Sequence, residues 1–507
     1  MNKFAEAAAA VGSIPDGATL GATGFRWGGA SELLLRTLGE RFRATGHPRD
    51  LTLVFSSASG DNVANGLEHL AQPGLLRRVV GGFWGVTPKL AALAEQGAIE
   101  AYNFPQGQIA RLYGAIASGL PGLVSKIGIG TYIDPRQGGG RMNDRTVTDL
   151  VEVVTIRGEE WLLFHALPID VAFVRGTTSD PRGNISMERE ALTTEALSLA
   201  FAAHNSRGRV IAQVVRQVAA GGVHPRAVAI PGYVVDQVVL ATDAETEHRQ
   251  CVESVYDARF TGDELASAVN DRQAPDLIRG LVAGRAMQEI RAGDVINLGQ
   301  GIPSEIAGLI RRTAIADSVH FTVESGVAGG IPRPVPDFGI AVNPEAILRQ
   351  DDQFVFYNGG GLDVAFLGFA EVDARANVNA SYFRGRSVGC GGFLDIAYPA
   401  RRLVMCGTFT AGGLAVAVEH GRLRVVAEGR TRKFVPELQQ LMFNTARARR
   451  GEQPILFVTE RCVFDVTADG LRLIEVAPGI DVDRDILPQM GFRPVVSDRL
   501  QPMSLAV

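Results

Sequence analysis

The sequence predicts an α/β fold in which one chain forms two related open, mostly parallel sheets. The chain has 507 residues, which is more than one compact core holds at roughly 150 residues per domain. Strand-like and helical segments alternate along it, and this is typical of parallel sheets with helices on both faces. One motif of strand and turn also occurs twice.

The predicted elements follow from local composition. Residues 1–10 are expected to form a helix rather than a signal peptide, because Glu6 interrupts their apolar run and Pro15 soon follows. Short runs of β-branched and aromatic residues predict buried strands, and longer mixed runs predict helices. The clearest strands are 51–55, 209–213 and 402–406, and the clearest helices are 31–42, 89–96 and 303–312.

The repeated motif is the best evidence for two related halves. Asp170-Val-Ala-Phe173 recurs as Asp363-Val-Ala-Phe366, 193 residues later. At the same spacing an Asp-x-Arg-x-Asn sequence follows each copy, with Asp180, Arg182 and Asn184 in the first and Asp373, Arg375 and Asn377 in the second. The apolar cores are typical of buried strands, and the following turns are ones in which Asp and Asn bond to their own backbone.

The two halves are predicted to be residues 1–262 and 263–507. The boundary falls in the polar stretch 257–276, which contains turn-forming residues. The first half is the longer between corresponding motifs, so we expect it to carry an insert near residues 100–165.

Composition and charge narrow the class of partner. The formal net charge is −5 and no block of like charges occurs, so neither nucleic acid nor an anionic membrane is an expected partner. No run approaches the roughly 18 apolar residues of a membrane span. The four cysteines lie far apart and the eight histidines form no H-E-x-x-H motif, so neither disulfides nor a metal site is expected. A cytoplasmic protein that acts on a small molecule fits these features.

The most informative segment runs from His320 to Pro332. Its β-favouring residues end at Glu324, and a glycine-rich stretch follows. We therefore expect Glu324 at the carboxyl end of a strand, where open α/β sheets bind ligands. A turn carboxylate that bonds to nearby amides is the alternative, and most glutamates in such places are structural.

Three other glycine-rich segments can offer backbone N–H groups to an oxyanion or a phosphate. They are residues 297–303, 358–363 and 388–393. None contains G-x-G-x-x-G, so the dinucleotide fingerprint is absent. For any single one of these glycines, packing at a tight turn is the more common explanation. Residues 385–389 match the esterase motif G-x-S-x-G, but Cys390-Gly-Gly392 follows where an esterase needs a helix.

Together these motifs resemble those of the family I coenzyme A-transferases, in their single-chain acetate or propionate branch. The resemblance rests on Asn297-Leu-Gly-Gln-Gly-Ile-Pro303, Val323-Glu-Ser-Gly-Val-Ala-Gly-Gly-Ile-Pro332, Gly359-Gly-Gly-Leu-Asp-Val-Ala-Phe-Leu-Gly368 and Cys406-Gly-Thr-Phe-Thr-Ala-Gly-Gly413. Further matches, such as Tyr102-Asn-Phe-Pro-Gln-Gly107 and Thr459-Glu-Arg461, extend it over nearly the whole chain. In this family two α/β halves close over one active site, which implies the CoA-transferase fold here.

The resemblance implies a covalent mechanism. The family's nucleophile, a glutamate in a Glu-Ser-Gly or Glu-Asn-Gly setting, corresponds to Glu324. It is expected to attack an acyl-CoA and to hold coenzyme A as a glutamyl-CoA thioester until a second carboxylate takes it. The implied substrates are acyl-CoA and short-chain carboxylates such as acetate, propionate or butyrate. The resemblance implies no metal or organic cofactor, and it implies a homo-oligomer.

Other site residues and functions stay open at this point. The candidates for CoA binding or oxyanion stabilisation, against simple turn packing, are Gly299, Gln300, Gly301, Ile302, Gly359, Gly360 and Gly361. Asn103 and Gln106 are candidates for holding the acyl or carboxylate end, against a structural role in a loop. The alternative functions are an acyl-CoA hydrolase on the same fold and a protein that binds acyl-CoA without turnover.

Overall fold

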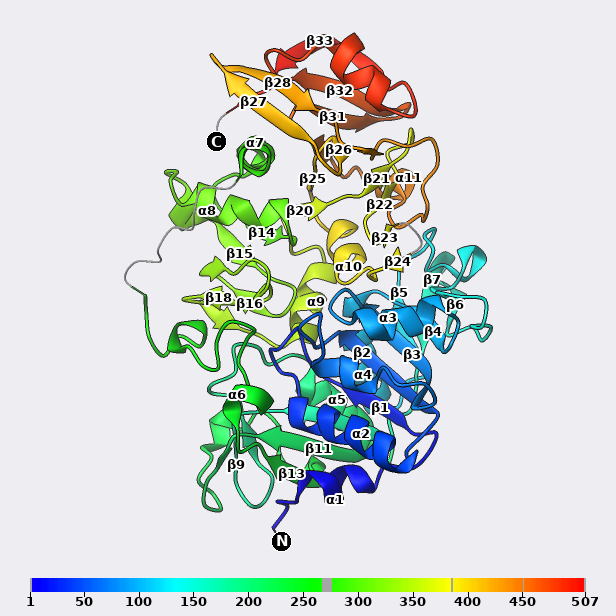
Figure 1. The fold of residues 1–507 in the computed structure, drawn as a ribbon, viewed down its shortest axis with the longest axis vertical. Coiled ribbons are helices and arrows are strands. Elements are labelled where there is room, and N and C mark those ends of the chain that lie inside the picture. Colours follow the sequence, from blue (N-terminus) through cyan, green and yellow to red (C-terminus); the bar gives the residue numbers. More distant parts are fainter. Residues whose placement is uncertain (1, 267–275, 384–385, 450, 506–507) are drawn as a thin grey trace.

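The structure is a computed structural model that describes residues 2–266, 276–383, 386–449 and 451–505. The two halves of the chain lie one above the other in Figure 1, with the first half, which begins in blue, below the second half, which ends in red. Each half is built on its own large sheet, as the sequence predicts. The boundary predicted in 257–276 lies partly outside the described residues.

The first half, within the described residues, forms a seven-stranded sheet whose strands pair in parallel. In spatial order these strands are β13 (Gln237–Leu240), β11 (Arg209–Val214), β8 (Val171–Arg175), β1 (Thr19–Ala22), β2 (Leu51–Ser57), β3 (Leu76–Phe83) and β4 (Glu100–Asn103). Strands β2 and β8 are buried along their whole length, as expected of central strands with both faces covered.

The second half forms a ten-stranded sheet over the described part of the chain. In spatial order its strands are β19 (Ala346–Ile347), β16 (Val327–Ala328), β15 (His320–Thr322), β14 (Val295–Leu298), β20 (Val364–Gly368), β25 (Leu403–Cys406), β30 (Ile455–Val458), β31 (Cys462–Thr467), β32 (Gly470–Val476) and β33 (Val495–Pro502). The central run from β15 to β30 is parallel, and antiparallel pairs extend it on both sides.

The repeated motif forms the same structure in both halves. Strands β8 and β20 each pair in parallel with the first strand of their half, β1 or β14. Asp170 accepts the Thr19 N–H at 2.8 Å, and Asp363 accepts the Val295 N–H at 3.0 Å. In the following turns each Asp accepts two backbone N–H groups and the side-chain amide of its Asn, at 2.9–3.1 Å. The predicted strand and self-bonded turn are therefore confirmed in both copies.

Residues 100–165 divide into two parts. Strand β4 is an edge strand of the large sheet, and α4 (Gln106–Ala117) packs against that sheet. The rest forms a separate antiparallel sheet in the order β5 (Gly122–Ser125), β7 (Glu159–His165) and β6 (Val151–Ile156). The start of the expected insert is thus integral to the large sheet.

The remaining elements cover the sheets or link their strands. The other helices are α1 (Ala7–Gly12), α2 (Glu32–Thr45), α3 (Pro88–Glu95), α5 (Ala196–Asn205), α6 (Ala244–Glu247), α7 (Leu277–Ala286), α8 (Ile306–Ile310), α9 (Gln350–Asn358), α10 (Phe393–Ala397) and α11 (Thr445–Arg449). Short strands are β9 (Thr178–Ser179), β10 (Ile185–Ser186), β12 (Arg216–Gln217), β17 (Ile331–Pro332), β18 (Ala341–Val342), β21 (Glu371–Val372), β22 (Val378–Asn379), β23 (Tyr382–Phe383), β24 (Arg386–Ser387), β26 (Thr410–Ala411), β27 (Ala415–Glu419), β28 (Arg422–Ala427) and β29 (Thr431–Arg432). Among the described residues, no helix is both long and apolar enough to cross a membrane.

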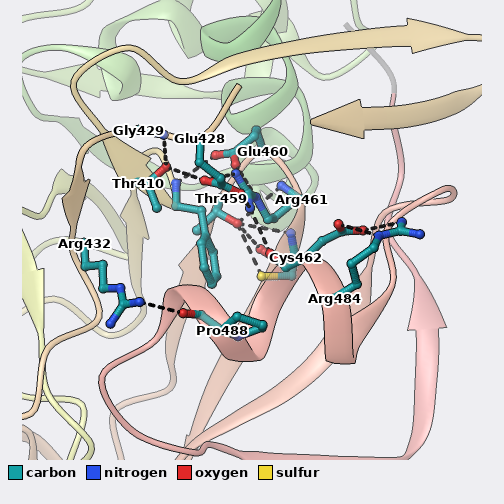
Figure 2. Close-up of polar contacts among 12 residues, drawn as sticks. Thr410, Glu428, Gly429, Arg432, Thr459, Glu460, Arg461, Cys462, Arg484 and Pro488 are labelled. Atoms are coloured by element: carbon teal, nitrogen blue, oxygen red, sulfur yellow. Dashed lines mark hydrogen bonds and ion pairs between the residues drawn. The ribbon is translucent and has the colours of Figure 1, made fainter. Parts of the chain in front are cut away.

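A buried ion network explains the Thr459-Glu460-Arg461 motif (Figure 2). Arg461 pairs with Glu460 at 2.7 Å and with Glu428 at 2.5 Å, and its guanidinium lies over the Phe409 ring. Arg461 and Glu460 are fully buried. Removing one member of such a network leaves an uncompensated buried charge, so these residues hold the turn between β30 and β31 in place.

Helix α4 joins the two halves. One hydrophobic core contains Tyr113 of α4 together with Phe354 of α9 and Leu394 of α10. Phe354 is fully buried, and burying such a side chain contributes about 2 kcal/mol. The halves therefore share a core.

Candidate active site

A cavity of about 460 Å³ lies where the two halves meet. Its walls come from loops that follow strands of both large sheets and from the starts of α4 and α10. Open α/β sheets bind ligands at this end of their strands. Apolar side chains dominate the lining, which is typical of a small-molecule site. Arg26 and Glu324 are the charged side chains of the lining within the described residues.

Glu324 lies two residues beyond β15, at the carboxyl end of that strand, as the sequence predicts. A tight turn follows, in which the Val323 N–H donates to the Val327 carbonyl at 2.8 Å. Gly326 has a φ of 109°, and a Cβ there would lie 2.1 Å from the Leu348 carbonyl oxygen. Only glycine fits this position, and the turn leaves the Glu324 side chain on the cavity wall.

The Glu324 side chain is partly buried on the cavity wall, and no donor among the described residues bonds to its carboxylate. Loss of surrounding water raises its pKa to about 7, and the negative charge of Asp395 adds to the rise. A carboxylate that is less hydrated and accepts no hydrogen bond from the protein is a better nucleophile than one in water. Among the described residues, no cluster of three or more His, Cys, Asp or Glu side chains is placed to hold a metal ion.

Asp395 of α10 binds the start of α4 in the other half. Its carboxylate accepts the Gly107 N–H at 2.9 Å and the Gln108 Nε2 at 2.5 Å. The first N–H groups of a helix have no partner within it, so Asp395 caps α4 across the boundary. Burial raises the pKa of Asp395 to about 6, although these bonds act against the rise.

The glycine-rich loop 388–392 forms the cavity wall beside Glu324. A Cβ at Gly392 would stand 3.3 Å from both Cδ and Oε2 of Glu324, so the backbone of this residue comes close to the carboxylate. Gly392 precedes α10, and within the described residues no acceptor is bonded to its N–H. This N–H can therefore bond to a ligand.

First-half atoms fix the position of this loop through four hydrogen bonds. They run from Trp84 N–H to Val388 O (2.8 Å), Gly391 N–H to Gly82 O (3.1 Å), Gln106 N–H to Gly391 O (2.9 Å) and Cys390 N–H to Asn103 Oδ1 (2.9 Å). The wall beside Glu324 thus depends on both halves.

Asn103 does not line the cavity. Its Nδ2 donates to the carbonyls of Gly81 and Gly82 at 2.9 and 2.6 Å, and its Oδ1 accepts from the Tyr132 hydroxyl and the Cys390 N–H. These bonds occupy the whole amide. Of the two roles that the sequence leaves open for Asn103, these bonds favour the structural one, in which it positions the loop.

Gln106 does line the cavity. Its side chain is fully buried, and neither Nε2 nor Oε1 has a hydrogen-bond partner. A buried amide without a partner is costly in the empty protein, so it favours a ligand that supplies one.

The first predicted glycine loop is partly at the cavity. Gly299, Gln300 and Gly301 line it, whereas Ile302 is not among the described lining residues. The Gly299 N–H already donates to the Phe366 carbonyl at 2.8 Å. The N–H groups of Gln300 and Gly301 are bonded to no acceptor in the described ranges, so these two remain candidates.

The second predicted loop, Gly359 to Gly361, is a helix end and not a donor site. Its three N–H groups donate to the carbonyls of Val355, Tyr357 and Phe356 at 2.9–3.1 Å. These are the last carbonyls of α9, which need partners at a helix C-terminus. Of the two alternatives that the sequence leaves open for these glycines, the bonds therefore favour turn packing over CoA or oxyanion binding.

The comparisons with known proteins agree with one another, and those with individual relatives cover nearly the whole chain. A family model described as Coenzyme A transferase matches residues 4–241. The chain is 41% identical to the acetate CoA-transferase YdiF of Escherichia coli K12, over 97% of this chain and 93% of that protein. It is 39% identical to the caffeate CoA-transferase of Acetobacterium woodii, over 99% of this chain and 97% of that protein.

Solved structures agree as well. The crystal structure of the acyl-CoA transferase YdiF apoenzyme from Escherichia coli O157:H7 matches with a TM-score of 0.93 and 39% identity, covering 100% of this chain and 96% of that one. A structure of the same protein described as a thioester complex with CoA gives a TM-score of 0.92 at 39% identity, with the same coverage.

Fold and cavity define a two-lobed α/β enzyme whose site lies between its lobes. The chain belongs to the coenzyme A transferase family, and it is a single-chain CoA-transferase of family I.

Two features of the site are missing from the sequence prediction, and a third is predicted only in part. Arg26 lies in a loop after β1, and Asp395 acts across the boundary between the halves. No sequence pattern indicates these two. The glycine-rich run 388–393 is predicted to offer backbone N–H groups to a ligand, but the position of Gly392 beside Glu324 is not predicted.

Proposed function

We propose that this enzyme transfers coenzyme A from a short-chain acyl-CoA to a carboxylate acceptor such as acetate, through a glutamyl-CoA thioester at Glu324. The observation that carries the proposal is the unbonded Glu324 carboxylate in the cavity shared by the two halves. The names of the relatives, an acetate and a caffeate CoA-transferase, support transfer to carboxylates. The CoA thioester complex of a relative supports a covalent intermediate.

The first half-reaction takes two steps. A Glu324 oxygen attacks the acyl-CoA carbonyl carbon, and the C–S bond breaks to give an acyl-glutamyl anhydride and the CoA thiolate. The thiolate then attacks the glutamyl carbonyl carbon, so that the acid leaves as a carboxylate and CoA stays bound as a thioester. In the second half-reaction an acceptor carboxylate reverses both steps. No cofactor is required, because CoA is itself a substrate.

Each step places negative charge on a tetrahedral oxygen, which needs fixed donors. The Gly392 N–H and the Gln106 amide are our candidates, because both are at the cavity and neither is bonded. One preorganised donor contributes roughly 3–4 kcal/mol to such a transition state.

The test replaces the nucleophile. Glu324→Gln should lower the rate of CoA transfer by roughly 10³-fold or more, as expected when a covalent nucleophile is lost. Wild-type enzyme incubated with acetyl-CoA should carry an adduct on Glu324 that borohydride reduces and hydroxylamine cleaves. Glu345→Gln, which removes an exposed carboxylate of the same half, should retain both properties.

Three results would contradict the proposal: an adduct elsewhere, no adduct, or full activity in Glu324→Gln. Release of CoA that does not increase with added acetate, and that forms no new thioester, would instead identify an acyl-CoA hydrolase.

A further inference from the structure

Arg26 is a buried cation in the cavity without an anionic partner. The residue is 6% exposed and lines the same cavity as Glu324. Its Nη2 contacts the neutral Gln300 Oε1 at 3.4 Å, and no carboxylate of the described residues forms an ion pair with it. Asp337 adds an attractive charge at longer range; its Oδ1 accepts the Val252 and Glu253 N–H groups, and its Oδ2 has no hydrogen-bond partner among the described residues.

The backbone holds Arg26 in a strained conformation. Its φ is 55°, in the left-handed region that non-glycine residues seldom occupy. Two hydrogen bonds fix it there, from the Arg26 N–H to the Ala58 carbonyl (3.1 Å) and from the Gly60 N–H to the Arg26 carbonyl (3.0 Å). Strain that the surrounding structure maintains is typical of ligand-binding positions.

We propose that Arg26 binds a second carboxylate on the acyl substrate, so that one of the two acids that exchange CoA is a dicarboxylic acid. The proposal rests on the proposed function and names the substrate class of the same site. The balanced reaction is transfer of CoA from acetyl-CoA to one end of a dicarboxylate, with release of acetate. The other end stays ionised beside the guanidinium.

The position of Arg26 in the cavity favours a distal carboxylate over a phosphate of CoA as its ligand. Arg26 lines the same cavity as Glu324, which has a volume of about 460 Å³. When the CoA sulfur is at Glu324, the whole pantetheine arm separates it from the phosphate groups. A distal carboxylate of a short acyl chain, by contrast, stays within the cavity.

The chemistry of the reacting end also favours a distal carboxylate. A guanidinium fork on the reacting carboxylate would stabilise the ground state and weaken the oxygen that must attack. The neutral amide of Gln106 suits that end better. A second carboxylate would instead give the buried Arg26 the partner that a desolvated charge requires.

The experiment compares acceptors of equal chain length. Acetyl-CoA is the donor, and succinate is compared with butyrate and glutarate with valerate. Arg26→Asn removes the cation and suits the positive φ, because asparagine tolerates the left-handed region. Arg26→Lys keeps the charge without the fork, and Arg43→Asn, at an exposed arginine of α2, is the matched control.

We expect wild type and Arg43→Asn to have a higher kcat/KM for each dicarboxylate than for the monocarboxylate of equal chain length. In Arg26→Asn, kcat/KM should fall roughly 10²-fold for dicarboxylates and less than about 3-fold for monocarboxylates. The kcat/KM of Arg26→Lys for dicarboxylates should lie between those of wild type and Arg26→Asn. Circular dichroism and Tm check folding. The glutamyl-CoA adduct formed from acetyl-CoA should be present in both wild type and Arg26→Asn. Absence of the adduct in wild type would refute the proposed function, independently of the role of Arg26.

Other outcomes would overturn the proposal. They are equal preference for both acids in wild type, equal losses for both acids in Arg26→Asn, or an increase in KM for acetyl-CoA that disappears with acetyl-pantetheine. The last result would assign Arg26 to a CoA phosphate.

Discussion

Ionisation of Glu324 sets the pH range of the proposed reaction. Burial raises its pKa to about 7, and the charge of Asp395 contributes to this value. The nucleophile must be ionised, so kcat/KM for acyl-CoA should fall as the pH drops below about 7. Burial raises the pKa of Asp395 itself to about 6, so Asp395 is largely ionised near pH 7, where its charge acts on Glu324.

Replacing Asp395 should shift this pH dependence. Asp395→Asn removes a negative charge near Glu324, which lowers the pKa of Glu324. We expect the acid limb of the kcat/KM profile for acetyl-CoA to move to lower pH. Asp352→Asn, at an exposed carboxylate of α9, should leave the limb in place. An unchanged limb in a folded Asp395→Asn variant would show that Asp395 does not act on the nucleophile.

At the scale of residues, the sequence could locate Glu324 but not its surroundings. The change from β-branched residues to glycine indicates where a strand ends, which is local information. Asp395 and Gly107 are far apart in the chain and meet only because α4 packs against α10. Arg26 looks like any arginine in a turn until its burial in the cavity is known.

At the scale of elements, α4 tolerates no added atoms at Gly107 in its first turn but does tolerate them at Gly114 in its last turn. A Cβ at Gly107 would lie 2.5 Å from Phe354 Cδ1 and 2.7 Å from Asp395 Cγ. A Cβ at Gly114 of the same helix would meet nothing within 4 Å. The helix therefore approaches the second half closely at its first turn.

This difference predicts opposite effects of the same substitution. Gly107→Ala should lower the free energy of unfolding by roughly 1–3 kcal/mol through overpacking. Gly114→Ala should leave it unchanged or raise it by up to about 1 kcal/mol, because alanine favours helix. Denaturant unfolding measures both. Equal effects would mean that α4 does not dock at Gly107 as described.

A second buried carboxylate near the boundary predicts a pH effect on stability. Glu195, fully buried, precedes α5 and accepts from Ser56 Oγ at 2.6 Å, and Gln350 of α9 donates to the same hydroxyl at 2.8 Å. Burial raises its pKa from 4.5 to about 7. The folded state thus binds a proton that the unfolded state releases, and wild-type stability should fall as the pH rises from about 4.5 to 7.

Glu195→Gln should remove this decrease in stability with rising pH. Relative to wild type, its free energy of unfolding should increase by about 3 kcal/mol between pH 4.5 and pH 8, the equivalent of the pKa shift. Glu40→Gln, at an exposed carboxylate of α2, should show no such trend. A difference between Glu195→Gln and wild type that does not vary with pH would refute the assignment.

The elements themselves were largely predictable, but their contacts were not. The strands at 51–55, 209–213 and 402–406 form nearly as expected, because hydrophobic patterning is local. The Gly359 to Gly361 run illustrates the limit. Glycine marks a place where backbone can approach another group, yet only the fold shows that this group is the end of α9.

At the scale of the whole molecule, the cavity exists only when both halves are present. Its lining takes Arg26 and Gln106 from the first half and Glu324 from the second. The halves also share the hydrophobic core around Phe354. The repeated strand-and-turn motif predicts two halves. It does not predict which of their faces meet, because the contact depends on side chains far apart in sequence.

Dividing the chain tests this organisation. Residues 1–262 and 263–507, produced separately, should each lack CoA transfer, because neither contains a complete cavity wall. Refolding them together should restore activity in proportion to the complex formed, measured by thioester exchange alongside size-exclusion chromatography. Activity in the second half alone would contradict a shared site.

The four hydrogen bonds that hold loop 388–392 to the first half have an evolutionary consequence. Trp84 and Gln106 take part through backbone atoms, but Asn103 contributes its side chain. An inherited change at Asn103 would displace the loop beside Glu324 without altering any atom that meets a substrate. Natural selection for turnover therefore also acts on an interior residue that never meets a substrate.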